Sequence, residues 1–356
     1  MSKKEIMEKN VCGGGRNSAI ELFRIITMFI IVAHHYVVNS GLSTLAYNNP
    51  ASANSIFLLL FGWGGKTGIN CFVLITGYFM CKSNITLRKF LKLVLWTEFY
   101  IIVLTVIFVL TGRKELNINI IKSLLPVSSV ADGFSSAYLV FYLFIPFLNI
   151  LIKGMDKKQH LLLICLCVCV YSVLATLNLK VVFNYVTWFS VIYIIGAYLR
   201  LYPEKWFESK KLWGIGTALS ILLSWSSILM PILLFKRATY FFISDSNKAL
   251  ALTTALCAFM FFKNLDIKQS KIINSIAASA YGVLLIHAGS DTMRQWLWYD
   301  TLHNTDYMNS NILAVHAICS VAGVYIICTI IDIIRYNIFE KPFFKWYDKK
   351  QRRVNV

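Results

Sequence analysis

The stretch AIELFRIITMFIIVAHHYVVNS (residues 19–40) is apolar enough to cross a bilayer, yet it carries an arginine and two histidines. A helix of that length extends about 33 Å, which matches the hydrocarbon core of a membrane. An ionisable side chain is costly at that depth, so Arg24 and His35 are expected to serve a function. The search for an activity therefore starts in this segment.

Further apolar segments follow the first, and most approach the roughly 20 residues that a transmembrane helix needs. The complete set is 19–40, 56–81, 90–111, 135–152, 161–178, 184–201, 212–234, 248–263, 276–290 and 311–335. Hydrophobic residues make up 57% of the 356-residue chain, more than a single soluble core can bury. We therefore predict an all-α fold, a polytopic integral membrane protein with about ten transmembrane helices.

Lys and Arg residues are distributed unevenly between the two sets of loops. With ten crossings, 25 of them lie in the tails and in the loops after even-numbered segments, and 8 lie in the opposite loops. Because Lys and Arg accumulate on the cytoplasmic side, both termini are predicted to be cytoplasmic. The net charge of +18 then reflects topology and contact with anionic membrane lipids, and nucleic acid is not an expected partner.

The chain is expected to form one membrane domain with two tails. Residues 1–18 are predicted to be a cytoplasmic N-terminal tail, 19–335 the ten-helix domain, and 336–356 a basic cytoplasmic C-terminal tail. The first segment is too long for a cleavable signal and should remain as an anchor. Any chemistry must then take place within the bilayer or at its edge.

Arg24 and His35 are predicted to share one face of the first helix. Eleven residues at 100° each end only about 20° beyond three full turns, and the two side chains lie about 16 Å apart along the axis. Two polar groups on one stripe predict a polar passage inside the bundle. Each residue alone also has an ordinary explanation, a snorkelling arginine or a hydrogen bond between helices. His34 is rotated by about 100° and cannot share the environment of His35.

This segment resembles the opening helix of the acyltransferase-3 family of membrane O-acyltransferases, whose signature is an arginine, ten residues and a histidine. Arg24 and His35 match that spacing, which selects His35 over His34. The resemblance continues in chain order through the segments Gly65–Met80, Arg88–Lys92, Tyr138–Asn149, Trp188–Arg200 and Tyr281–His287. It implies transfer of an acyl group, usually acetyl from cytoplasmic acetyl-CoA, to a hydroxyl of an extracytoplasmic polysaccharide or its lipid-linked precursor.

The residues fit the chemistry that the resemblance implies. A neutral histidine in a desolvated site suits removal of a hydroxyl proton, so His35 is the predicted general base, with Arg24 as the essential arginine. His35 could also be acylated itself, although direct transfer is preferred. Arg24, Arg88 and Lys89 are candidates to hold the phosphates of CoA. Arg88 and Lys89 are explained at least as well as ordinary anchors on the cytoplasmic side.

Other polar residues within the apolar segments are candidates for substrate binding, namely Lys66, Asn70, Tyr78, Glu98, Tyr138 and His287. Lys66 could stabilise an oxyanion or lie at the outer interface. Glu98 is more readily a structural partner of Arg24 or of a loop cation than a catalytic acid. His287 could orient an acceptor or occupy the interface. Asp332 lies three residues before Arg335, which predicts a local ion pair.

No sequence pattern indicates a metal site or a bound cofactor, and acetyl-CoA enters only as the acyl donor. The expected partners are acetyl-CoA, a cell-surface glycan such as a capsule or its lipid-linked precursor, and membrane lipids. The expected location is a bacterial plasma membrane. The main alternative is a transporter or flippase of a small molecule or lipid-linked sugar, which predicts discontinuous helices or paired halves; no paired halves are visible.

Overall fold

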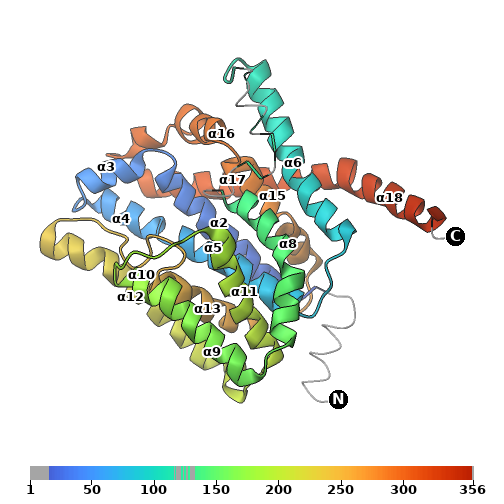
Figure 1. The fold of residues 1–356 in the computed structure, drawn as a ribbon. Coiled ribbons are helices and arrows are strands. Elements are labelled where there is room, and N and C mark those ends of the chain that lie inside the picture. Colours follow the sequence, from blue (N-terminus) through green and yellow to red (C-terminus); the bar gives the residue numbers. More distant parts are fainter. Residues whose placement is uncertain are drawn as a thin grey trace.

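The computed structural model describes residues 16–354 except 116, 118–121, 123, 126 and 129–132, so most of the predicted N-terminal tail lies outside the described residues. The described part is helical and contains no strand (Figure 1). In chain order the helices are α2 (Ser18–Val38), α3 (Leu42–Asn48), α4 (Ala53–Phe61), α5 (Gly65–Met80), α6 (Leu87–Leu110), α8 (Phe134–Lys153), α9 (Lys157–Val168), η1 (Cys169–Val173), α10 (Leu174–Thr176), α11 (Tyr185–Leu201), η2 (Lys205–Glu208), α12 (Lys210–Phe235), α13 (Ala249–Lys263), α14 (Lys271–Ala278), α15 (Ala280–Ala288), α16 (Asp291–Gln295), η3 (Trp296–Thr301), η4 (Asn304–Tyr307), α17 (Leu313–Arg335), η5 (Tyr336–Glu340) and α18 (Lys341–Val354).

The helices agree with the apolar segments of the sequence. Within the described residues, 8 helical stretches are long and apolar enough to cross a membrane, and the shorter apolar helices α11 and α13 accompany them. Each predicted segment falls on one of these stretches. The predicted fold class, an all-helical polytopic membrane protein, is confirmed. The exact number of crossings and the cytoplasmic position of the termini stay predictions.

The outer surface of the bundle is apolar. Leu222, Leu233 and Phe235 of α12 and Ile326 and Ile330 of α17 are each more than half exposed. Such large contiguous apolar surfaces are rare on soluble proteins. Hydrocarbon therefore has to supply the burial that the protein core does not.

The second predicted segment is not one continuous helix. Helix α4 ends at Phe61 and α5 begins at Gly65, with a turn between them. The break lies against α2: a Cβ atom on Gly64 would lie 2.2 Å from Ile30 Cγ2, and one on Gly65 would lie 2.2 Å from His34 Cγ. Glycine fits here because the side chains of Ile30 and His34 fill the space that a Cβ atom would need.

Helix α5 lies at the centre of the bundle and packs against α2, α11 and α13 (Figure 1). Its contact with α11 is made backbone to backbone. A Cβ atom on Gly77 would lie 2.5 Å from the carbonyl oxygen of Tyr193, and one on Gly196 would lie 2.8 Å from that of Leu74. Small residues at such crossings allow membrane helices to gain packing energy.

Replacing Gly77 by alanine is expected to lower the free energy of unfolding by about 1–3 kcal/mol, because the added methyl group overpacks against the backbone of α11. Thermal unfolding of the purified protein in detergent measures the effect. Gly323 of α17 provides the control, since a Cβ atom there meets nothing within 4 Å. Equal melting temperatures for the two variants would contradict the proposed backbone contact.

Candidate functional site

Helix α2 presents Arg24 and His35 from one uninterrupted helix, as the spacing predicted. The side chain of Asn17 fixes the start of this helix by accepting hydrogen bonds from the backbone amides of Ala19 and Ile20. The two functional candidates nevertheless have different surroundings. Arg24 lines a cavity, whereas His35 is bonded to a second histidine.

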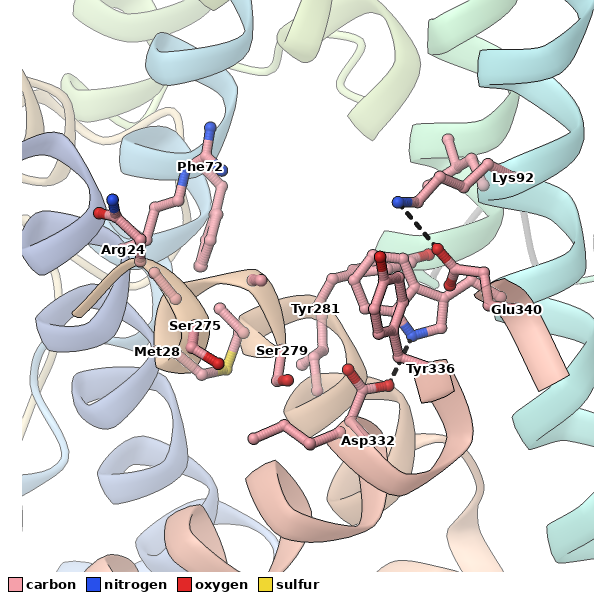
Figure 2. Close-up of a pocket in the computed structure, with 18 of the residues that line it drawn as sticks. Arg24, Met28, Phe72, Lys92, Ser275, Ser279, Tyr281, Asp332, Tyr336 and Glu340 are labelled. Carbon is pink, nitrogen blue, oxygen red and sulfur yellow. Dashed lines mark hydrogen bonds and ion pairs between the residues drawn. The ribbon is translucent and has the colours of Figure 1, made fainter. Parts of the chain in front are cut away.

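The cavity has a volume of about 690 Å³. In Figure 2, Arg24 and Phe72 lie on one side of it, while Lys92, Tyr336 and Glu340 lie on the other. Its charged lining residues are Arg16, Arg24, Lys92, Lys271, Arg335, Asp332 and Glu340. Five cations thus face two carboxylates, so the cavity favours an anionic ligand.

Arg24 is only weakly paired with a carboxylate. Its guanidinium Nη1 lies 3.6 Å from Glu21 Oε1, a long ion pair, and its side chain is 31% exposed. Glu21 is buried, and its second carboxylate oxygen has no hydrogen-bond partner in the described part of the chain. Tyr138 lines the same cavity and shares a 2.8 Å hydrogen bond with the hydroxyl of Thr76.

The opposite wall of the cavity is an ion network. Asp332 Oδ1 accepts from Arg335 Nε at 2.8 Å, from Trp96 Nε1 at 2.9 Å and from the hydroxyl of Tyr100 at 2.8 Å. Arg335 Nη1 also donates to Glu340 at 2.8 Å. The other oxygen of Glu340 pairs with Lys92 Nζ at 2.8 Å. The predicted ion pair between Asp332 and Arg335 is present, and it belongs to this larger cluster.

Each of the adjacent histidines of α2 makes its own hydrogen bond. His34 Nδ1 lies 2.6 Å from the carbonyl oxygen of Gly62, in the turn between α4 and α5. His35 Nδ1 lies 2.9 Å from Nε2 of His287 on α15. His287 is fully buried, and its Nδ1 lies 2.6 Å from the carbonyl oxygen of Val283. His34 thus supports the helix break, while His35 belongs to a histidine pair.

The cavity and the histidine pair are not continuous. Met28 on α2 and Leu284 on α15 line the cavity, whereas His35 and His287 do not. Seven helical residues, about 10.5 Å, separate Met28 from His35. Ile31 lies between them and packs on α5, since a Cβ atom on Gly68 would lie 2.6 Å from its Cγ1. The predicted polar passage along the stripe is therefore interrupted by an apolar layer.

Several other candidates have partners of their own. Lys66 Nζ donates to the hydroxyl of Tyr185 at 2.9 Å and lies 3.4 Å from Asp245 Oδ1. Asn70 is fully buried, where it accepts from Trp188 Nε1 and donates to the carbonyl of Ser246. These contacts tie the start of α5 to α11 and to a loop. Their roles toward a substrate stay predictions.

Two further candidates also lie outside the cavity lining. The hydroxyl of Tyr78 accepts from Arg200 Nη1 at 3.1 Å. Glu98 lies half-buried on α6, and its buried Oε1 has no hydrogen-bond partner within the described residues. Of the two partners considered for Glu98, Arg24 or a loop cation, Arg24 pairs with Glu21 instead.

Arg88 and Lys89, at the start of α6, do not line the cavity. Arg88 makes a bidentate ion pair with Asp348 of α18, at 2.8 and 3.0 Å. Lys89 donates to the hydroxyl of Ser83 and to the carbonyl of Asn84. Lys92, one turn later, is the residue of this helix that reaches the cavity as a cation. Binding of CoA by Arg88 and Lys89 stays a prediction, and these contacts supply each with a structural role.

Four of the five cations of the cavity were not among the residues predicted to bind the donor, namely Arg16, Lys92, Lys271 and Arg335. Arg16 donates to the backbone carbonyl of Asn274 at 2.9 Å, which joins the start of α2 to α14. No spacing in the sequence links these residues. Their one shared signal is that all four were counted with the loops and tails predicted to be cytoplasmic.

One comparison with known proteins found a match. A family model described as an acyltransferase domain matches residues 17–333 of the chain. No curated protein matches the chain, and no solved structure matches it. The matched region contains α2, most of the cavity lining and the histidine pair.

Proposed function

Because the chain belongs to the acyltransferase-3 family, and is thus a membrane acyltransferase, we propose that it moves an acetyl group from cytoplasmic acetyl-CoA to a hydroxyl of an extracytoplasmic polysaccharide or its lipid-linked precursor. The observation that carries this proposal is the cationic cavity together with the histidine pair. Helices α2 and α15 contribute residues to both. In acetyl-CoA, the phosphates suit the cationic cavity and the thioester at the end of the narrow arm suits the histidine pair.

The charge of the cavity supports a cytoplasmic donor. Arg16, Lys92, Lys271 and Arg335 come from four separate regions that the positive-inside rule assigns to the cytoplasm, and all four line this cavity. Arginine and lysine recognise phosphate oxygens by charge-assisted hydrogen bonds. The CoA phosphates are therefore proposed to bind here, with the pantetheine arm passing the apolar layer at Ile31 to reach His35.

The proposed reaction needs one base and no acylated form of the protein. His35 removes the proton of the acceptor hydroxyl while its oxygen attacks the thioester carbonyl. When the tetrahedral intermediate collapses, the carbon–sulfur bond breaks, and the CoA thiolate takes the proton back from His35. The products are the O-acetyl ester and free CoA.

The acceptor is proposed to arrive along the membrane. The loops between the helices are short, so they offer little surface for recognising a free polysaccharide. A lipid-linked or nascent chain would reach the outer side of the histidine pair without such a surface. Mass spectrometry of surface glycans with and without the gene identifies the acceptor. Loss of O-acetylation with normal polymer export supports the transferase; a defect in export alone supports the transporter.

Replacing Arg24 by glutamine is expected to raise the KM for acetyl-CoA by about tenfold, since charge-assisted hydrogen bonds are worth about 1.5–3 kcal/mol. Incorporation of radiolabelled acetyl into the polysaccharide fraction of membranes measures it. The KM for S-acetylpantetheine, which lacks the nucleotide phosphates, should change little. Lys157→Gln serves as the control, because this lysine pairs with Glu204 and does not line the cavity. An equal loss with both donors would argue against phosphate binding by Arg24.

A further inference from the structure

The pairing of His35 with His287 joins residues on α2 and α15 that are 252 positions apart in the sequence. His287 is completely buried, and its ring lies near the equally buried ring of Trp298, with 6.4 Å between ring centroids. A buried side chain whose two nitrogens are both engaged has its proton positions fixed by its partners. Those partners can be read from the hydrogen bonds.

The first proton is assigned by a backbone carbonyl. His287 Nδ1 lies 2.6 Å from the carbonyl oxygen of Val283, one turn earlier in α15. A carbonyl oxygen only accepts, so Nδ1 of His287 carries the hydrogen. In the neutral ring, Nε2 of His287 is then an acceptor.

The second proton follows from the first. Nδ1 of His35 lies 2.9 Å from that acceptor, so it must donate, and it therefore carries the hydrogen of the neutral His35 ring. The opposite assignment needs a doubly protonated His287. Burying that charge is costly. Arg294, whose guanidinium donates to the carbonyl of the adjacent Ala288, already places a cation beside it.

We infer that His287 is a positioning residue, which holds His35 in the tautomer that carries hydrogen on Nδ1 and leaves the lone pair on Nε2 free to act as the base. This inference rests on the proposed function, in which His35 is the base. The bond strengthens when His35 becomes an imidazolium, because a charged donor makes a stronger hydrogen bond than a neutral one. His287 therefore contributes more in the transition state than before it.

Three replacements of His287 separate positioning from packing. Glutamine places an amide oxygen where Nε2 stands and can accept from His35. Asparagine places its amide near Nδ1 and cannot reach His35, and leucine accepts no hydrogen bond. His287→Leu and His287→Asn are expected to lower kcat by about 10²-fold, the usual cost of a misplaced catalytic group, with KM for acetyl-CoA unchanged. His287→Gln is expected to restore most of the activity.

The measurement is incorporation of radiolabelled acetyl from acetyl-CoA into the polysaccharide fraction of membranes that contain the full-length protein. His160→Leu is the matched control: it removes another fully buried histidine, which bonds the carbonyl of Ile194 away from the pair, and it should leave kcat unchanged. Equal losses for the glutamine and asparagine variants, or full activity for the leucine variant, would overturn the inference. Full activity of His35→Ala would instead show that another residue is the base, whereas no acetyl incorporation by the unchanged protein would overturn the proposed function itself.

Discussion

Replacing His35 by alanine is expected to lower the rate of acetyl transfer by about 10²–10⁴-fold, the range that a general base contributes. The expected loss is large because His35 stands at the histidine position of the family signature. It is also the histidine of α2 that bonds the buried His287. KM for acetyl-CoA should be preserved, since His35 does not line the cavity where the donor is proposed to bind. Transfer of radiolabelled acetyl to membrane polysaccharide is the measurement.

His34→Asn is the matched control for this prediction. The two histidines are neighbours, yet His34 bonds the carbonyl of Gly62 through Nδ1. The amide of asparagine occupies a place similar to Nδ1, so the bond can be kept while the ring is lost. This variant should retain most of the activity. If His35→Ala transfers acetyl as fast as the unchanged protein, another residue must be the base.

Replacing Arg335 by methionine is expected to lower the free energy of unfolding by about 3–5 kcal/mol, the cost of leaving buried charges without their partner. The side chain of Arg335 is 5% exposed, and those of Asp332 and Glu340 are 3% and 7% exposed. Removing the guanidinium leaves Asp332 without a countercharge and Glu340 with Lys92 alone. Unfolding of the purified protein in detergent, followed by temperature or denaturant, measures the loss.

A compensated variant tests whether charge is the cause of that loss. Arg335→Met combined with Asp332→Asn and Glu340→Gln removes the unpaired carboxylates, and most of the stability should return. Lys157→Met, which breaks an exposed ion pair with Glu204, should have little effect on unfolding. If the triple variant is no more stable than Arg335→Met alone, packing of the arginine rather than its charge holds the cavity wall together.

The sequence predicted the elements of the candidate site but not their assembly. The spacing of Arg24 and His35 correctly placed both on one helix, and the spacing of Asp332 and Arg335 correctly predicted an ion pair. Both predictions depend on residues within one helix, where 3.6 residues per turn fixes the geometry. The segment 56–81 was predicted as one helix, although Gly62, Gly64 and Gly65 were a visible signal for the break between α4 and α5.

The sequence did not predict the contacts between helices. Nothing in the chain indicated that His287 would bond His35, or that Arg88 would pair with Asp348 of α18 instead of facing the cavity. Likewise, the apolar layer at Ile31 that interrupts the stripe on α2 follows from how α5 packs against that helix. The helical repeat relates residues within one helix, and it does not indicate which residues of two helices meet.

The sequence alone determined that this chain is a helical membrane protein, where its apolar segments lie, and which helix carries the arginine and histidine of the family. Hydropathy determines this because transfer into hydrocarbon is an additive property of each segment. The tertiary structure alone decided which helices touch, and so which residues form the cavity and the histidine pair. Lipid and leucine are equally apolar, so lateral packing is set by small residues and polar bonds that meet only in three dimensions.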